Sequence, residues 1–116
     1  MVISPHADDA TAFCGGTLAK LANQGWKVIL VRVTDDRKDS LGLSIEATIQ
    51  KNAEELRAAA RILGVQEIVE LGFETDMLAD IPLGKLRERI VYLFRKYQPY
   101  AVFSFCLLYT SPSPRD

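Results

Sequence analysis

A dense group of potentially reactive side chains lies close to the amino terminus. Residues 4–9 read Ser-Pro-His-Ala-Asp-Asp, so one imidazole and two carboxylates fall within four residues. His6 and Asp9 are three residues apart and can converge on one cation if the segment begins to coil. Neutral imidazole nitrogen and carboxylate oxygen are ligand types that catalytic zinc takes. Asp8 lies between them and could accept the proton of a water molecule that attacks a substrate there.

The same segment allows simpler interpretations. Asp8 or Asp9 could serve only as the N-cap of a helix, and His-x-Asp-Asp is a short pattern of low specificity. The glycine pair Gly15-Gly16 predicts room for a substrate to approach the backbone at the start of that helix. Cys14 is predicted to be a packing residue rather than a nucleophile, because the chain has no second histidine to activate it.

The elements that must position these residues alternate along the chain. The pattern predicts strands over residues 2–4, 27–34, 67–71 and 100–105, and helices over 13–23, 46–63 and 82–97. The second strand is apolar at nearly every position, which is typical of a central strand covered on both faces. Gly64 predicts a left-handed helix cap, and Pro82 the first turn of the third helix. This order predicts the α/β class: a Rossmann-like three-layer sandwich around a parallel sheet.

Two apolar patterns and one aromatic side chain complete this expected packing. The first helix carries Phe13, Leu18, Leu21 and Ala22 at helical spacing. The third is expected to bury a stripe formed by Leu83, Leu86, Ile90, Leu93 and Tyr97. Trp26 is expected to pack at the entrance of the second strand.

Polar residues follow each expected strand, at the edge where parallel sheets bind ligands. The sequence therefore predicts that His6, Asp8, Asp9 and Asp35 lie together at the carboxyl edge of one sheet. Asp35 and Asp36 could contact a sugar hydroxyl there, although a solvated turn is the favoured interpretation. Glu74 and Asp76 follow the third strand and face the same edge.

Composition limits the classes of function. The chain has 116 residues, and its 14 basic and 15 acidic side chains leave a net charge of −1, which gives no electrostatic reason to expect binding to nucleic acid or anionic membranes. No apolar run reaches the roughly 18 residues of a membrane span, and no secretory signal is visible. Two cysteines cannot build a disulfide framework. We expect a cytoplasmic domain with no nucleic-acid partner.

Several blocks, taken in chain order, resemble the PIG-L/LmbE-like family of zinc-dependent N-acetylglucosamine deacetylases. The blocks read SPHADD, CGGTLAKLANQG, a strand ending in Thr-Asp, ELRAAARILGV and LGF, and they extend from Val2 to about Phe105. The family signature runs His-Pro-Asp-Asp-Glu and then Gly-Gly-Thr. The resemblance implies a zinc cofactor held by His6 and Asp9, with Asp8 as the general base. The implied reaction releases acetate from an N-acetylated amino sugar or a related small acylated substrate.

The chain departs from the family pattern at several positions. Ala7 and Ala10 replace the usual Pro and Glu, and Asn52 stands where many members have Arg. The family's third zinc ligand is a His beyond the fourth strand, and this chain has no His after His6. We therefore expect residues 1–105 to be the N-terminal part of such a deacetylase domain, inactive and weakly metal-binding by itself. Residues 106–116 read as a non-native or disordered tail.

An alternative function from another class is a non-catalytic Rossmann-like module that binds a sugar or a nucleotide at the same edge. No Gly-x-Gly-x-x-Gly follows the first strand, which weakens the dinucleotide version of this hypothesis.

Overall fold

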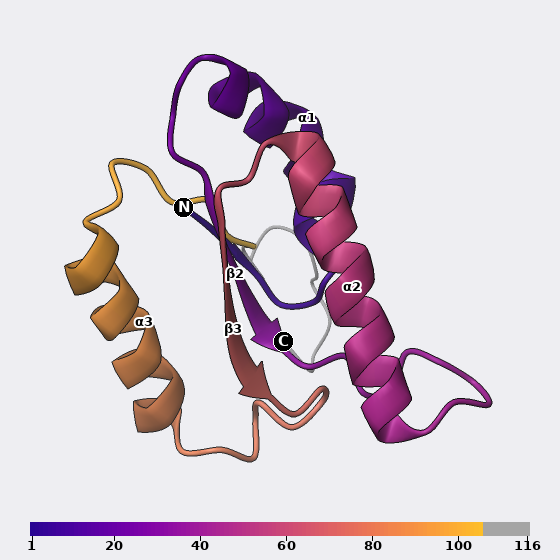
Figure 1. The fold of residues 1–116 in the computed structure, drawn as a ribbon. Helices are drawn as coiled ribbons and strands as arrows, with labels where there is room; N and C mark the ends of the chain where they lie inside the picture. Colours follow the sequence, from indigo (N-terminus) through magenta and orange to yellow (C-terminus); the bar gives the residue numbers. More distant parts are fainter. Residues whose placement is uncertain (106–116) are drawn as a thin grey trace.

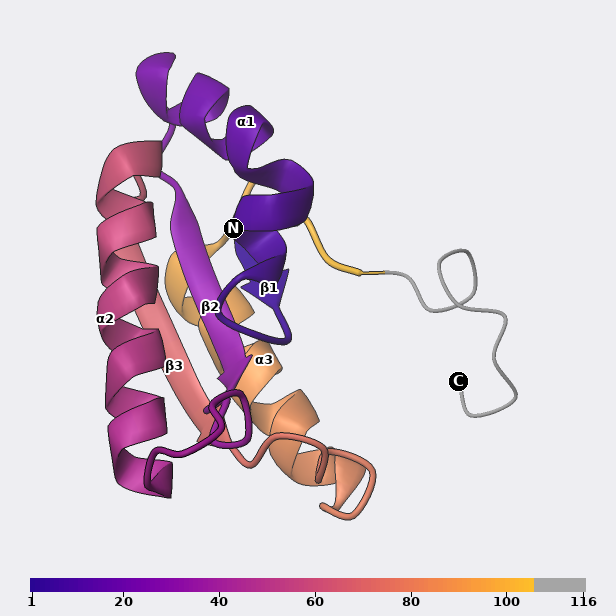
Figure 2. The same cartoon turned by 90° about the vertical axis from the view of Figure 1, so that its right-hand side faces the viewer.

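The computed structural model describes residues 1–105 and shows a three-layer α/β fold (Figure 1). Its sheet consists of three parallel strands in the spatial order β1 (Val2–Ser4), β2 (Ile29–Thr34), β3 (Glu67–Phe73). The connecting helices are α1 (Asp9–Asn23), α2 (Ile45–Leu63) and α3 (Leu83–Tyr97). Helices α1 and α2 cover one face of the sheet, and α3 lies on the other (Figure 1, Figure 2). The predicted fold class is confirmed, whereas the predicted tail lies outside the described residues.

Residues 100–105 do not form the full fourth strand that the pattern predicts. Only Phe103 pairs with the sheet, through a parallel bridge to Val2. Its N–H donates to the Met1 carbonyl at 3.0 Å, and its carbonyl accepts from the Ile3 N–H at 2.9 Å. The pairing is short because β1 is only three residues long and offers few backbone groups. The chain nevertheless crosses to the far side of β1, so that β1 lies between Phe103 and β2. This is the strand order of a Rossmann-like sheet.

Strand β2 is the centre of the molecule, as its apolar sequence predicts. Every residue of β2 is buried, and Leu30 is aligned with Val2 on one side and Ile68 on the other. The strand begins at Ile29, two residues later than expected. The core cluster around it comprises Val2, Ala10, Leu18, Val28, Leu30 and Leu56.

Helix α1 begins at Asp9, four residues earlier than predicted. It begins there because the buried Ser4 hydroxyl accepts a hydrogen bond from the Ala10 N–H at 3.1 Å. Phe13 is consequently on the outer side of the helix, where it is 75% exposed and its ring meets Phe105 edge to face. The other residues of the expected pattern do face the core, because Leu18 is buried and Leu21 and Ala22 pack against the core cluster.

The glycine pair has a different place from the one predicted. Gly15 and Gly16 lie in the middle of α1 rather than at its start, so they do not open the helix terminus to a substrate. Gly15 is buried and faces α2, where an added Cβ would lie 3.5 Å from Leu63 Cδ2. Cys14 donates its thiol to the Ala10 carbonyl at 3.2 Å, and burial raises the pKa of that thiol. Both observations agree with a packing role for this stretch.

Gly64 ends α2 in the left-handed conformation that the sequence predicts, with φ 74°. A Cβ at this position would lie only 2.9 Å from the Ala22 Cβ, near the end of α1. Glycine therefore satisfies two demands here, a positive φ and a close approach between helices.

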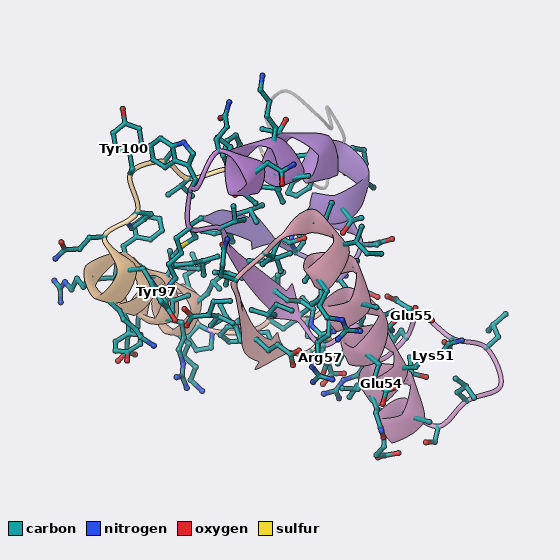
Figure 3. All side chains as sticks on the ribbon, turned by 45° about the horizontal axis from the view of Figure 1, so that its top comes forward. Lys51, Glu54, Glu55, Arg57, Tyr97 and Tyr100 are labelled. Carbon is teal, nitrogen blue, oxygen red and sulfur yellow. The ribbon has the colours of Figure 1, made fainter. Side chains whose placement is uncertain are left out.

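Helix α3 covers its face of the sheet only in part. Leu93 is buried, but Leu83, the first residue of the expected stripe, is 79% exposed. Near the end of α3, the Tyr97 hydroxyl donates to the carboxylate of Glu67 in β3. Lys51 and Glu54 project from the outer side of α2, whereas Arg57 lies on the side toward β3, 4.0 Å from Glu70 (Figure 3). Within residues 1–105, no helix combines the length and the apolar character that a membrane crossing requires.

Candidate active site

The loop between β1 and α1 carries the residues that the sequence singles out, and side-chain hydrogen bonds fold it tightly. Ser4, fully buried, donates its hydroxyl to the His6 carbonyl at 2.6 Å. Asp9 accepts from the His6 N–H at 3.0 Å through Oδ2. These bonds hold the His6 backbone against the first turn of α1, so His6 and Asp9 stay together at the carboxyl end of β1.

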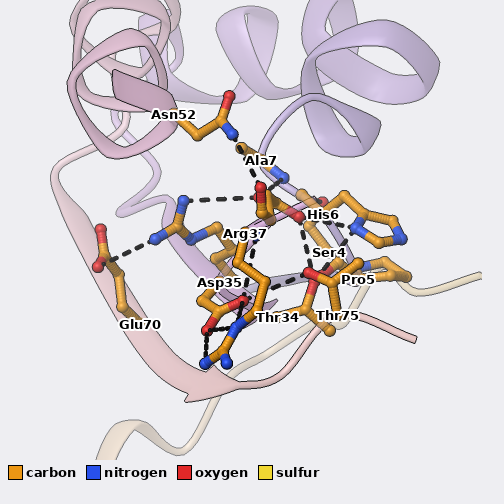
Figure 4. Close-up of polar contacts among 12 residues, drawn as sticks. Ser4, Pro5, His6, Ala7, Thr34, Asp35, Arg37, Asn52, Glu70 and Thr75 are labelled. Atoms are coloured by element: carbon orange, nitrogen blue, oxygen red, sulfur yellow. Dashed lines mark hydrogen bonds and ion pairs between the residues drawn. The ribbon is translucent and has the colours of Figure 1, made fainter. Parts of the chain in front are cut away.

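The end of β2 docks directly onto this loop. The N–H and hydroxyl of Thr34 both donate to the Pro5 carbonyl, at 2.9 and 2.8 Å. Beyond Thr34, Asp36 reaches back so that Oδ1 lies 2.7 Å from His6 Nδ1 and Oδ2 accepts from the Ala7 N–H at 2.9 Å (Figure 4). The prediction that the residues after β1 and β2 share one edge of the sheet is therefore confirmed.

The interpretation of Asp35 and Asp36 as a solvated turn is wrong. Asp35 is 6% exposed and Asp36 is not exposed at all. The Arg37 guanidinium binds Asp35, with Nη2 2.6 Å from Oδ2. It also pairs with Glu74, whose Oε2 lies 3.0 Å from Nη1. Burial by itself would raise the pKa of Asp35, but the hydrogen bonds and charge of Arg37 outweigh it and hold the pKa below 3.8. With its carboxylate bound in this way, Asp35 supports the edge of the sheet rather than a ligand.

A buried arginine behind the site was missed by the sequence analysis. Arg32 lies inside β2, is 2% exposed, and forms ion pairs with Asp36 at 3.5 Å and Glu70 at 3.2 Å (Figure 4). The Nε and Nη1 atoms of Arg32 have no hydrogen-bond partner among the described residues. The sequence did hint at this arginine, because it is a charged residue within a strand that is otherwise apolar at nearly every position and expected to be buried on both faces. Such a charge is retained in a core when it has a counter-ion.

Asp8 differs from its neighbours because its side chain is free. It occupies the N-cap position of α1 but makes no capping hydrogen bond, and it is exposed. It lines a cleft of about 340 Å³, together with Asp39, Asn52 and Glu55. The simple N-cap interpretation therefore fails for Asp8. Its carboxylate faces a space that a small molecule could enter.

The edge of the sheet gathers donors that suit a metal ion. His6, Asp36 and Asp39 each offer one ligand atom, and these atoms lie within 4.8 Å of one another. Imidazole and carboxylate donors fit a zinc-type cation. The structure thus adds Asp36 and Asp39 to the neighbourhood of His6, whereas Asp9, the predicted second ligand, binds the His6 backbone.

The closeness of His6, Asp36 and Asp39 shifts pKa values within this group. Partial burial would lower the pKa of His6, but the hydrogen bond and charge of Asp36, aided by Asp9 and Asp39, raise it above 6.5. The pKa of Asp39 is raised above 3.8, first by burial and then by repulsion from Asp36. A cation placed here would relieve that repulsion.

Comparison with known proteins finds relatives among deacetylases. A diacetylchitobiose deacetylase of Thermococcus kodakarensis is 31% identical over 102 residues, which are 85% of this chain and 37% of that protein. The structure of N,N'-diacetylchitobiose deacetylase from Pyrococcus horikoshii matches with a TM-score of 0.79 at 32% identity, covering 87% of this chain and 38% of that one. The chain thus spans about two fifths of the length of these relatives.

The fold alone also extends to a different chemistry. GalB, the 4-carboxy-2-hydroxymuconate hydratase from Pseudomonas putida, has a TM-score of 0.77 at 24% identity, over 91% of this chain and 46% of its own. The family is decided by sequence: the family model described as PIG-L, GlcNAc-PI de-N-acetylase, matches residues 1–112. With that match over nearly its whole length, the chain belongs to the PIG-L family.

Proposed function

We propose that these residues supply the catalytic loop of a zinc-dependent hydrolase that removes an N-acetyl group from an amino sugar or a related conjugate. The observation that carries this proposal is the loop itself. His6, Asp8 and Asp9 stand at the carboxyl edge of a parallel sheet whose chain is similar to diacetylchitobiose deacetylases. We assign His6 and Asp9 to hold the metal, and Asp8 to act as the general base.

The assignment of His6 and Asp9 follows the family signature, whereas the role of Asp8 is also supported by its surroundings. When bound, zinc would polarise the acyl carbonyl and lower the pKa of the attacking water. Asp8 is exposed in the cleft and bears no capping bond, so it can accept the proton of that water. The water oxygen bonds to the acyl carbon, the C–N bond breaks, and Asp8 returns the proton to the leaving amine. Acetate and a free amino sugar result.

The test is acetate release from N,N'-diacetylchitobiose by the protein in the longest form that its gene encodes. We expect turnover that is lost after treatment with a chelator, restored by zinc, and absent in His6→Ala. Release of acetate that neither the chelator nor His6→Ala changes would contradict a metal at this loop. Binding of the disaccharide with no acetate release under any of these conditions would favour a binding module.

A further inference from the structure

Asp36 adopts a backbone conformation that its residue type makes costly. Its φ is 56°, in the left-handed region that residues other than glycine rarely occupy, although Asp tolerates it better than most. Its carbonyl accepts from the Asn52 side-chain amide at 3.1 Å and from the Asp39 N–H at 3.2 Å, and these bonds secure the turn. Strain of this kind persists where the surroundings require it, so the side chain of Asp36 merits a functional explanation.

Both oxygens of the Asp36 carboxylate already have partners in the protein. Oδ1 lies 2.7 Å from His6 Nδ1 and 3.1 Å from the Thr34 hydroxyl. Oδ2 accepts from the Ala7 N–H at 2.9 Å and faces the Arg32 guanidinium at 3.5 Å. Oxygens bound in this way are less available to a cation than a free carboxylate. Asp36 is therefore poorly suited to be a ligand, although it belongs to the group that lies around His6.

The buried Arg32 guanidinium lies beside this buried carboxylate. Asp36 has no exposure to water, and an ionised carboxylate in such a place requires a counter-ion. Arg32, itself 2% exposed, supplies that charge from inside β2. An ionised acceptor 2.7 Å from Nδ1 favours the imidazole form whose proton is on Nδ1. The lone pair of the neutral ring is then on Nε2.

We propose that Asp36 is a positioning residue: held by Arg32, it fixes the rotation and the tautomer of His6 so that Nε2 is the nitrogen presented to the metal. Hydrogen-bonded carboxylates behind metal-ligating imidazoles have this effect in general. The assignment rests on the proposed function, because it takes His6 as a metal ligand. It adds two residues, Asp36 and Arg32, that touch neither substrate nor metal.

The experiment uses the fact that His6 is the only histidine of the chain. A long-range ¹H–¹⁵N correlation spectrum of the metal-free, ¹⁵N-labelled protein, recorded where the ring is neutral, reports which ring nitrogen carries the proton. We expect the Nδ1–H tautomer to predominate in the wild type. Predominance of the Nε2–H tautomer would overturn the proposal, and this result needs no variant to fold.

Variants then identify the residue responsible. Asp36→Gly removes the carboxylate and relieves the positive φ, and it leaves Glu70 as the remaining ion-pair partner of Arg32 among the described residues; it should lose the preference for Nδ1–H. Asp36→Asn, nearly isosteric, should weaken the preference. Asp39→Asn is the matched control, since Asp39 is exposed and makes no bond to the ring, and it should leave the tautomer unchanged. An unchanged tautomer in Asp36→Gly would overturn the proposal.

A zinc titration followed by calorimetry separates positioning from ligation. Asp36→Asn is expected to bind Zn²⁺ about 10- to 100-fold more weakly than the wild type. Complete loss of binding in Asp36→Asn, to the level of His6→Ala, would make Asp36 a ligand and overturn its assignment. The tautomer is measured without metal or substrate, so its outcome is independent of whether the protein proves to be a deacetylase.

Discussion

At the scale of single residues, the site depends on how differently two adjacent carboxylates are bound. Asp9 is held by the His6 N–H, whereas Asp8 is exposed in a cleft and caps nothing. The Asp8→Asn variant should therefore retain zinc within a few-fold of the wild-type affinity but lose turnover by about 10²- to 10⁴-fold. Zinc affinity and acetate release, measured together with His6→Ala, check this. If Asp8→Asn lost zinc as completely as His6→Ala, Asp8 would be a ligand.

The ion pair of Asp35 with Arg37 lets us predict how the free energy of unfolding changes with pH. The pKa of Asp35 is lower in the folded protein than its usual 3.8, because Arg37 outweighs the effect of burial. A carboxylate of this kind stabilises the fold above pH 3.8, and the contribution is lost as the pH falls from there through the folded pKa. Arg37→Gln should therefore make the free energy of unfolding fall less steeply below pH 4.

The matched control for this prediction is Lys38→Gln. Lys38 is the adjacent cation, and it is exposed and pairs only with the exposed Asp76, at 3.7 Å. Urea unfolding of the three proteins between pH 3 and 6 provides the measurement. Parallel pH profiles for Arg37→Gln and the wild type would show that the pair with Asp35 is not the cause.

Residue types and spacing predict only part of the site. The placement of His6 and Asp35 at one edge of the sheet follows from alternating strands and helices, because parallel strands end at one edge. The burial of Asp36 does not follow, since Asp-Asp-Arg-Lys-Asp is typical of an exposed turn. It depends on Arg32, whose charge inside an apolar strand is compensated by residues that the sequence does not show to be neighbours.

At the scale of helices and strands, α1 and α2 approach each other closely where the two helices end. Gly64 lies at this contact, with φ 74° and only 2.9 Å between a built Cβ and Ala22. Gly64→Ala should therefore lower the free energy of unfolding by about 2–4 kcal/mol, from left-handed strain and overpacking together. Urea unfolding of wild type and variant measures the change.

Gly16→Ala is the control for this substitution. Gly16 is exposed within α1, and an added Cβ would meet no other part of residues 1–105 within 4 Å, apart from its chain neighbours and its own helix backbone. Alanine at such a position should raise the stability by about 0.5–1 kcal/mol through helix propensity. Equal effects of the two substitutions would mean that the close approach at Gly64 is not what distinguishes them. The sequence predicted the cap at Gly64 but not this contact, which depends on how the two helices cross.

At the scale of the whole molecule, the two faces of the sheet are covered unequally. Helices α1 and α2 bury the core on one face, whereas α3 on the other face buries only Leu93 among its residues (Figure 2). An apolar cavity of about 310 Å³ remains beside α3, and Trp26, Tyr97 and Tyr100 are among its lining residues. Trp26 is indeed at the entrance of β2, as expected, but it is 45% exposed and stacks on Tyr100.

This uneven packing predicts that the 116-residue chain by itself is marginally stable. We also expect zinc to add little to its free energy of unfolding. The residues of the chain provide one imidazole to a metal, and catalytic zinc sites commonly have three protein ligands. A ligand stabilises the native state by RT ln(1 + [L]/Kd), so zinc at ten times its Kd adds only about 1.4 kcal/mol. We expect a low thermal midpoint that shifts by a few degrees with zinc, and weak binding in calorimetry. Tight stoichiometric binding, with a large shift that His6→Ala abolishes, would show instead that the donors gathered around His6 form a complete site.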